Sequence, residues 1–257
     1  AQRSDAPRVS QQGPATPDHV IRTKRVPMLG RDVAAYAQTY RHYFERNASL
    51  AKEPKSMLDA APRMVLDPEL GFCAIGRTAR DARIVRDLYS HTIEVIQRSV
   101  ALGGYQALPE KDIFDVEYWD LEQAKLKKAG KPPMFTGEVV LVTGAASGIG
   151  KACVEAFLKR GAAVVGLDIN PAVEALAASR PDVLGITCDI TSEGSLGQAL
   201  DKAVSAFGGL DMLVLNAGVF PGGQRIASLM DDEWRRVNRV NVDANLSLLR
   251  ECHPLLK

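Results

Sequence analysis

The sequence predicts an α/β protein whose second half forms a partial doubly wound parallel sheet of four strands, preceded by an α+β segment. In the second half, four short runs rich in Val, Leu and Ile alternate with helical patterns, at residues 138–145, 162–169, 183–190 and 212–218. Such continuous apolar runs indicate parallel strands that are covered by helices on both faces. A glycine-rich loop follows the first run. The Lys-rich segment 125–131, closed by Pro132-Pro133, marks a change of composition, so we predict two domains, 1–132 and 133–257.

The first half is predicted to begin irregularly and then to form a helix, a hairpin and a second helix. The first thirty residues are polar and punctuated by prolines, which favours loop or extended chain. A helical pattern covers residues 32–46, and residues 63–76 are typical of two short strands about a turn at 67–69. Thr78 is a candidate N-cap for a long helix, which the glycines at Gly103-Gly104 end.

The composition excludes several classes of protein. Hydrophobic residues make up 46% and charged residues 25% of the 257 positions, which is an ordinary globular composition. A net charge of +1 gives no electrostatic footprint for nucleic acid or an anionic membrane. No run approaches the ~20 apolar residues of a membrane span, and the start of the chain lacks both a signal peptide and an initiator methionine. The four cysteines form no C-x-x-C pair, so we expect neither a zinc cage nor a disulfide framework. We therefore expect an internal fragment of a longer, cytoplasmic protein.

The glycine-rich loop is predicted to bind a dinucleotide. The apolar strand that ends at Thr143 runs into Gly144, and Gly148 and Gly150 open a helix whose apolar residues fall on one face. Glycines are needed where the backbone approaches a pyrophosphate closely, and free N–H groups at a helix N-terminus receive its negative charge. A second strand ends in Asp168, eighteen residues after Gly150, where a carboxylate would bind the adenosine ribose hydroxyls. This order of elements predicts a Rossmann-type site.

Two other interpretations of this loop remain open to the sequence. A Walker-type phosphate loop would place Ser or Thr after Lys151, but Ala152 stands there, so Mg²⁺ would lack its ligand. The loop could also be only a tight strand-to-helix turn, with Asp168 a solvated strand end. The combined signals favour the dinucleotide over both.

Four motifs in the second half resemble the short-chain dehydrogenase/reductase family. They are Thr143-Gly144-x-x-x-Gly148-Ile149-Gly150, Cys188-Asp189-Ile190, Asn216-Ala217-Gly218 and Trp234 followed by Asn241, in order within residues 138–257. The resemblance implies an oxidoreductase in which Asp189 and Ile190 flank the adenine of the cofactor. It also implies that the Asn216-Ala217-Gly218 segment supports the strand end near the nicotinamide ribose.

The cofactor implied by this resemblance is NAD rather than NADP. Asp168 would repel a 2′-phosphate, and Ser147 is neutral where NADP-preferring relatives often carry a basic residue. The predicted cofactor-binding residues are Gly144, Ser147, Gly148, Ile149, Gly150, Asp168, Ile169, Asp189, Ile190, Asn216, Ala217 and Gly218.

Asn241 is implied to be the asparagine of the family's catalytic tetrad, as a buried amide that holds a water in a proton relay. The alternative is a polar residue at the edge of the apolar stripe of a helix that begins near Asp231. Asn216 could likewise be no more than a turn residue.

The family's Tyr-x-x-x-Lys pair, which exchanges a proton with the substrate oxygen, should follow Asn241. None of the six tyrosines has Lys four residues later, and all precede Thr143. We therefore expect Lys257 to be a truncation point, and we expect the chain as it stands not to turn over. Four strands in the order 3-2-1-4 would also leave the fourth strand as an exposed edge.

The first half resembles the end of a class II aldolase domain, over residues 62–104. The order of the whole chain resembles bifunctional rhamnulose-1-phosphate aldolase/short-chain dehydrogenases. Where class II aldolases carry a metal-binding His-Gly, this chain has Leu70-Gly71, so no metal site is predicted. His19 is interpreted as a loop histidine satisfied by local hydrogen bonds, and the aromatic stretch 114–119 as a packed contact between domains.

The leading hypothesis for the complete protein is an NAD-dependent oxidoreductase of carbohydrate metabolism, acting on a hydroxyl or ketone of a sugar-derived or other small polar substrate. One alternative is a protein that is chiefly a metal-dependent lyase, and another is a non-catalytic NAD-binding module. We expect a small-molecule substrate and a homo-oligomer, without nucleic acid or membrane partners.

Overall fold

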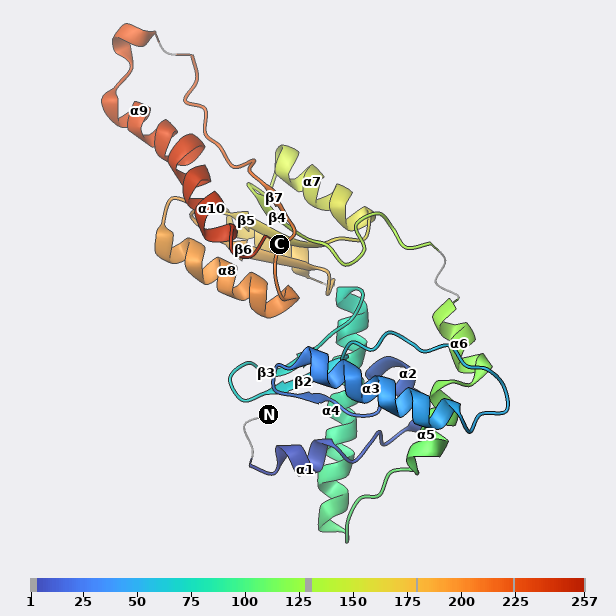
Figure 1. Ribbon diagram of the computed structural model, residues 1–257. Helices are drawn as coiled ribbons and strands as arrows, with labels where there is room; N and C mark the ends of the chain where they lie inside the picture. The colour runs from blue at the N-terminus through green and yellow to red at the C-terminus, as the bar shows by residue number, and fades with distance from the viewer. Residues whose placement is uncertain (1–3, 128–130, 179, 224, 257) are drawn as a thin grey trace. The chain divides into compact units, whose positions relative to one another are not determined.

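The computed structural model describes residues 4–127, 131–178, 180–223 and 225–256 (Figure 1). The chain divides into two compact units, residues 1–131 and 132–257. This division lies one residue from the predicted boundary. Each unit is described by itself below.

Unit 1 contains a three-stranded sheet in the order β1-β2-β3. Strand β1 (Met28–Leu29) runs parallel to β2 (Met64–Asp67), which pairs antiparallel with β3 (Gly71–Ala74). The Asp67 carboxylate accepts hydrogen bonds from the N–H groups of Glu69 and Leu70, both at 2.8 Å, and so closes the turn between β2 and β3. The hairpin predicted at 63–76 is therefore confirmed.

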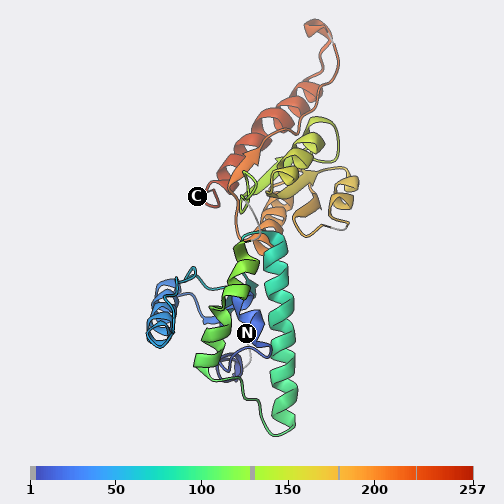
Figure 2. The ribbon, with the colours of Figure 1, turned by 90° about the vertical axis from the view of Figure 1, so that its right-hand side faces the viewer.

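Two long helices of unit 1 begin after side chains that cap them, and of these two caps Thr78 was predicted. Asp32 accepts a hydrogen bond from the Ala35 N–H at the start of α3 (Val33–Ala48). Thr78 does the same for the Asp81 N–H at the start of α4 (Ala79–Ala101), which appears as the long green helix of Figure 2. Caps of this kind satisfy N–H groups that have no partner within the helix. Unit 1 also contains α5 (Glu110–Glu117) and α6 (Asp120–Lys127).

The prediction of loop or extended chain for the first thirty residues is wrong in part. The segment contains α1 (Ala6–Ser10), a 3₁₀ helix (Pro17–His19) and α2 (Val20–Thr23). Proline stands in the first turn of both α1 and the 3₁₀ helix, where its missing N–H costs nothing. The prolines therefore start short helices rather than prevent them, and the burial of Val9 and Val20 holds these helices in place.

Two aromatic residues of the stretch 114–119 belong to the core of unit 1. Phe114 and Tyr118 are almost fully buried, and their rings stack at 4.6 Å between centroids. They pack against Tyr40 and Tyr43 of α3, which belong to the same unit. Trp119, the last residue of the stretch, is exposed, and the contact between domains stays a prediction.

Unit 2 contains a four-stranded parallel sheet in the order β6-β5-β4-β7. The strands are β4 (Val139–Thr143), β5 (Ala163–Asp168), β6 (Val183–Thr187) and β7 (Met212–Val214). This is the predicted order 3-2-1-4, with β7 as an edge strand. The helices are α7 (Gly148–Lys159), a 3₁₀ helix (Pro171–Ala177), α8 (Glu193–Phe207), a short 3₁₀ turn (Ile226–Ser228), α9 (Asp231–Asn238), a π-helical turn (Arg239–Asp243) and α10 (Ala244–Cys252).

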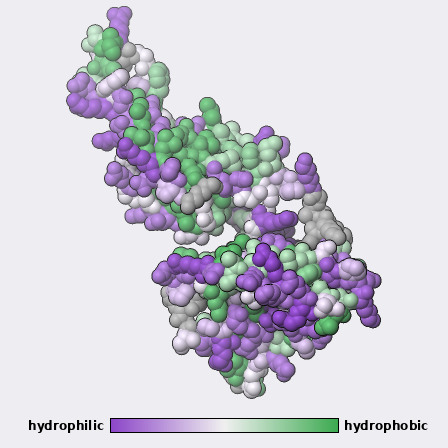
Figure 3. Space-filling view, viewed as in Figure 1, coloured by the Kyte–Doolittle hydropathy of each residue, from purple (hydrophilic) through white to green (hydrophobic). Residues whose placement is uncertain are grey.

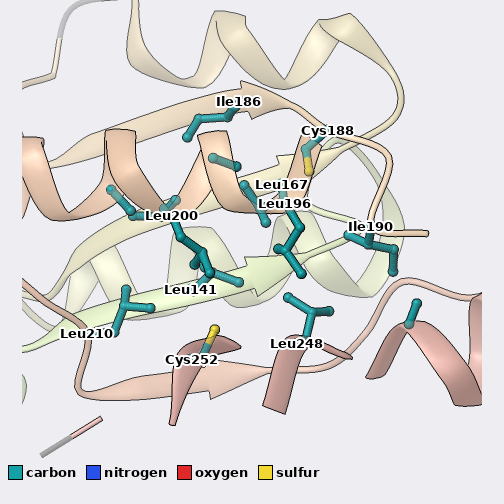
Figure 4. Packing of buried hydrophobic residues seen from close by; sticks show 14 of the residues in the cluster. Leu141, Leu167, Ile186, Cys188, Ile190, Leu196, Leu200, Leu210, Leu248 and Cys252 are labelled. Carbon is teal, nitrogen blue, oxygen red and sulfur yellow. The ribbon is translucent and has the colours of Figure 1, made fainter. Parts of the chain in front are cut away.

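Helices cover both faces of this sheet, with α7 on one side and α8 and α10 on the other (Figure 1). Successive residues of a strand point to opposite faces, so Leu141 joins one hydrophobic cluster while Val140 and Val142 join the other. Figure 4 shows Leu141 and Leu248 pointing toward one another in the first cluster. Burial on both faces explains why these strands are continuous apolar runs.

The surface of unit 2 carries exposed hydrophobic side chains. Figure 3 shows hydrophobic residues gathered over the region of β7 and α10, where Leu215, Leu246 and Leu249 are exposed. No helix in the described part of the chain is both long and apolar enough to cross a membrane.

Candidate functional site

Three segments meet at one edge of the unit 2 sheet, where the parallel strands β4, β5 and β7 end. They are the glycine-rich loop from Gly144 to Ser147, the carboxylate of Asp168, and the segment 216–218. In open α/β sheets, ligands bind outside the carboxyl ends of the strands. The predicted cofactor residues are therefore brought to the edge where a ligand site is expected.

The glycines of the loop serve different steric purposes. A Cβ added to Gly150 would lie 2.0 Å from the Gly144 carbonyl oxygen, and one added to Gly144 would lie 2.8 Å from Asn216 Nδ2. These two glycines let helix α7 and the loop pack closely. A Cβ on Gly148, whose φ is +52°, would meet nothing within 4 Å. Gly148 thus borders open space at the start of the helix and takes a backbone conformation that favours glycine.

The N-terminus of α7 offers hydrogen-bond donors to this open space. The first N–H groups of an α-helix have no partner within the helix and carry partial positive charge. Within α7 the first backbone donor is Lys151 N–H, which bonds to the Ser147 carbonyl oxygen at 3.1 Å. The Ser147 side chain makes no capping bond, and the Ile149 side chain is exposed. A phosphate group is the kind of anion that such a helix N-terminus binds.

Asp168 lies at the end of β5 and is tied to the glycine-rich loop. Its Oδ2 accepts a hydrogen bond from the Ala146 N–H at 2.9 Å, and its Oδ1 accepts one from the Asn170 N–H at 2.8 Å. The side chain is half-buried, and the neighbouring Ile169 is exposed. Asp168 is therefore not merely a solvated strand end.

A buried hydroxyl connects β4 to the segment after β7. Thr143 is fully buried, and its Oγ1 accepts hydrogen bonds from the N–H groups of Asn216 and Ala217, both at 3.0 Å. Asn216 Nδ2 donates in return to the Thr143 carbonyl oxygen at 2.9 Å. Asn216 therefore joins two neighbouring strand ends and is more than a turn residue. The sequence analysis placed Thr143 in the glycine-rich motif but missed this role. The one signal for it in the sequence is a polar residue at the end of an apolar strand.

Asn241 lies in the π-helical turn and pairs with the main chain after β7. Its Nδ2 donates to the Val219 carbonyl oxygen at 2.9 Å, and its Oδ1 accepts from the Val219 N–H at 2.8 Å. The predicted buried amide is wrong for this structure, because the Asn241 residue is exposed. Its amide is occupied in holding the loop beside Gly218, whose added Cβ would lie 3.2 Å from Asn241 Oδ1.

The two residues predicted to flank an adenine differ in exposure. Asp189 is exposed, and its Oδ1 accepts hydrogen bonds from the N–H and hydroxyl groups of Thr191. The side chain of Ile190 is buried in the hydrophobic core instead. Of this pair, only the Asp189 side chain lies at the surface.

Unit 1 holds a buried polar network that the sequence did not predict. Glu117 is fully buried and accepts hydrogen bonds from the hydroxyls of Tyr40 at 2.7 Å and Tyr43 at 3.1 Å. Lys24 Nζ lies 3.7 Å from Glu117 Oε1, and burial lowers the Lys24 pKa to about 8 although Glu117 opposes this shift. Burial likewise raises the pKa of Glu117. Both side chains are closed off from solvent, so the network is a structural element of unit 1.

The histidines do not form a metal site within the described residues, where no group of three or more His, Cys, Asp or Glu side chains could hold a metal ion. His19 lies in the first 3₁₀ helix, and its buried Nδ1 has no hydrogen-bond partner. The expectation of a histidine satisfied by local hydrogen bonds is therefore wrong for this atom.

Comparisons with known proteins give a family for each half of the chain. Residues 1–126 match the family described as aldolase class II, second domain, and residues 138–257 match the short chain dehydrogenase family. The resemblance predicted for residues 62–104 is thus part of a longer match.

The relatives cover the two halves differently. The uncharacterized oxidoreductase YuxG of Bacillus subtilis is 32% identical over 238 residues, which are 83% of this chain and 34% of that protein. The 3beta-hydroxysteroid dehydrogenase 2 of Eggerthella lenta is 33% identical over 126 residues, 46% of this chain and 48% of its own length. The chain therefore spans about a third to a half of these relatives.

Among solved structures, the 3-ketoacyl-(acyl-carrier-protein) reductase of Brucella melitensis complexed with NADH is 34% identical, with a TM-score of 0.45. The likeness covers 46% of this chain and 50% of that one. The family matches, together with the strand order and the loop geometry, identify residues 138–257 as part of the short-chain dehydrogenase/reductase family of oxidoreductases, joined to a class II aldolase segment at residues 1–126.

Proposed function

We propose that unit 2 binds NAD and belongs to an enzyme that transfers hydride between the nicotinamide and a hydroxyl or ketone group of a small substrate. The observation that carries the cofactor choice is the position of Asp168, whose carboxylate lies at the end of β5 and contacts the loop at Ala146. The open space at Gly148 and the donors of the α7 N-terminus would hold the pyrophosphate. The Asp168 carboxylate would then accept hydrogen bonds from the adenosine ribose.

The charge of Asp168 supports NAD over NADP. A single negative charge 4 Å from this carboxylate would cost about 1 kcal/mol in water and about 4 kcal/mol at the effective dielectric constant of a protein surface. The 2′-phosphate of NADP carries more than one negative charge near pH 7. We therefore expect NADP to bind at least about tenfold more weakly than NAD, since 1.4 kcal/mol corresponds to a factor of ten.

The cofactor supplies the hydride donor or acceptor, and the residues of this chain bind and orient it. Thr143, Asn216 and Asn241 fix the main chain at the carboxyl end of β7, which we assign to the nicotinamide side of the site. We propose a sugar-derived or other small polar substrate because an aldolase segment precedes the dehydrogenase in the same chain. A reducing, cytoplasmic environment fits the cysteines, which are all free.

A second candidate function is aldol cleavage by the complete protein. The match of residues 1–126 to the second domain of class II aldolases favours it. Under this proposal the complete protein has both activities. The dehydrogenase would then act on a hydroxylated compound that is chemically related to the substrate or a product of the aldolase.

Equilibrium titration of the protein with NAD and with NADP tests the cofactor assignment. The wild type is expected to prefer NAD at least tenfold, and Asp168→Ala is expected to bind NAD more weakly and to lose most of the preference. Asp182→Asn, at the opposite end of the same sheet, is a control and should leave both affinities unchanged. Equal affinities of the wild type for the two dinucleotides, or an unchanged preference in Asp168→Ala, would remove the ribose assignment.

A further inference from the structure

The Asp168 carboxylate joins two segments that flank the predicted ribose position. One of its hydrogen bonds goes to Asn170, two residues ahead, and closes a local turn. The other crosses to Ala146, twenty-two residues earlier, in the middle of the glycine-rich loop. The second bond is a long-range tether between the end of β5 and the loop.

The glycine-rich loop needs such a tether. Gly144 and Gly148 have φ values of +68° and +52°, and glycine loses more backbone freedom on ordering than any other residue. Fixing the backbone of a residue costs conformational entropy, which contacts with the rest of the protein have to offset. Between the two glycines, the Ala145 N–H bonds to the Leu167 carbonyl oxygen at 3.1 Å, and the Ala146 N–H bonds to Asp168 at 2.9 Å. Only the second of these bonds depends on a side chain.

We propose that Asp168 is a positioning residue for the glycine-rich loop, in addition to being a ligand for the ribose. This inference rests on the proposed function, because the loop is taken to hold the pyrophosphate of NAD. By fixing the Ala146 peptide, the carboxylate sets the direction in which the loop enters α7 at Gly148. The donors of the helix N-terminus are then arranged before any cofactor arrives.

The carboxylate has the capacity for both roles at once. An ionised carboxylate has about four acceptor positions on its two oxygens. Ala146 uses one position on Oδ2 and Asn170 uses one on Oδ1, which leaves one on each oxygen for a pair of ribose hydroxyls. The Asn170 bond keeps the carboxylate from turning, and Asn170 is itself held because its Oδ1 accepts from the Ala172 N–H at 2.9 Å. The next residue, Pro171, restricts Asn170 to the extended conformation that it adopts.

This double role has a consequence that separates it from ribose binding alone. If Asp168 acted only on the ribose, an NAD analogue that lacks both the 2′- and the 3′-hydroxyl of the adenosine would lose little affinity when Asp168 is replaced. If Asp168 also positions the loop, the same analogue loses affinity, because its pyrophosphate meets a loop that must first be ordered. Hydrogen bonds to charged groups are stronger than bonds between neutral groups, so the loss of this one should be large enough to measure as a change in Kd.

Two measurements on the complete protein test the proposal. The first is hydrogen exchange at the Ala146 amide without cofactor, in the wild type and in Asp168→Ala. We expect exchange at least tenfold faster in the variant, with the amides of β4 unchanged. The second is the Kd for the 2′,3′-dideoxyadenosine analogue of NAD, which we expect to rise about tenfold in Asp168→Ala.

The variants are chosen so that each result can be interpreted. Asp168→Asn keeps the shape and one acceptor oxygen, so it provides an intermediate exchange rate even if Asp168→Ala folds poorly. Asp182→Asn, whose carboxylate pairs with Arg180 away from the loop, is the matched control and should leave both readouts unchanged. An unchanged Ala146 exchange rate, with weaker binding of NAD but not of the analogue, would overturn the positioning role and leave only the ribose role. Failure of the wild type to bind either dinucleotide would instead contradict the proposed function. In that case the exchange rate of the Ala146 amide would still show whether Asp168 holds the loop.

Discussion

Replacing Gly150 with alanine tests the packing of the glycine-rich loop. Helix propensity alone predicts a more stable protein, whereas packing predicts a less stable one. Gly150 lies in the first turn of α7, and alanine is favoured over glycine within a helix by about 1 kcal/mol. Its Cβ, however, would lie 2.0 Å from the Gly144 carbonyl oxygen and 2.6 Å from Asn216 Nδ2. The first of these contacts is with backbone, so the loop or the helix has to move by more than 1 Å to reach ordinary van der Waals distance.

Overpacking of this kind typically costs 1–3 kcal/mol, and a backbone obstacle places Gly150→Ala at the upper end. After the helix-propensity gain, we expect the free energy of unfolding of unit 2 to fall by about 2 kcal/mol. Gly197→Ala is the matched control, because Gly197 lies within α8 and its added Cβ would meet nothing within 4 Å. That variant should gain up to about 1 kcal/mol.

Urea denaturation of the two variants, followed by a signal that reports on unit 2, measures both changes. We expect the free energy of unfolding to fall in Gly150→Ala and to rise in Gly197→Ala. If Gly150→Ala were stabilised as much as Gly197→Ala, the close packing of α7 on the loop would be refuted, and with it the shape of the proposed pyrophosphate site.

Three further variants are predicted to have measurable effects. Thr143→Val leaves two partly buried N–H groups without their acceptor and should lower the free energy of unfolding by about 2 kcal/mol in denaturant titrations. A loss well below about 1 kcal/mol would show that the hydroxyl does not join the two strand ends. Burial lowers the pKa of Lys24 to about 8 against about 10.4 in an unfolded chain. The unfolded state therefore binds more protons between pH 8 and 10, and this group makes unit 1 more stable as the pH rises through that range. The rise should be absent from Lys24→Met/Glu117→Gln, and an identical pH dependence in both proteins would contradict the assignment. Asn241→Ala should speed hydrogen exchange at the Val219 amide and lower kcat of the complete enzyme, whereas normal kcat and exchange would make Asn241 a polar residue without a role in the site.

The parts of the fold that the sequence predicted are those with a strong local pattern. The four strands of unit 2 are continuous apolar runs because both faces of the sheet are covered, and their predicted order is the order observed. The cap Thr78 was recognisable because the side chain and the N–H that it accepts from lie three residues apart. The position of Asp168 relative to the loop also followed from the spacing along the chain.

The parts that could not be predicted depend on contacts between residues far apart in the sequence. Glu117 meets the Tyr40 hydroxyl across 77 positions, and nothing near either residue signals a buried charge. The bonds between Asn241 and Val219 join residues 22 positions apart, and Asn241 lies in a π-helical turn that the helical pattern does not predict. In the first thirty residues, tertiary burial of short helices outweighed a composition typical of loops.

The central claim, that the glycine-rich loop and Asp168 together bind NAD, is tested most directly by amide chemical shifts during titration with NAD. The account predicts that the largest shifts fall on residues 146–150 and 168–170, with the amides of unit 1 unaffected. It also predicts that NADP produces the same pattern only at concentrations at least tenfold higher. Saturable NAD binding with shifts confined to residues outside these two segments would contradict the claim.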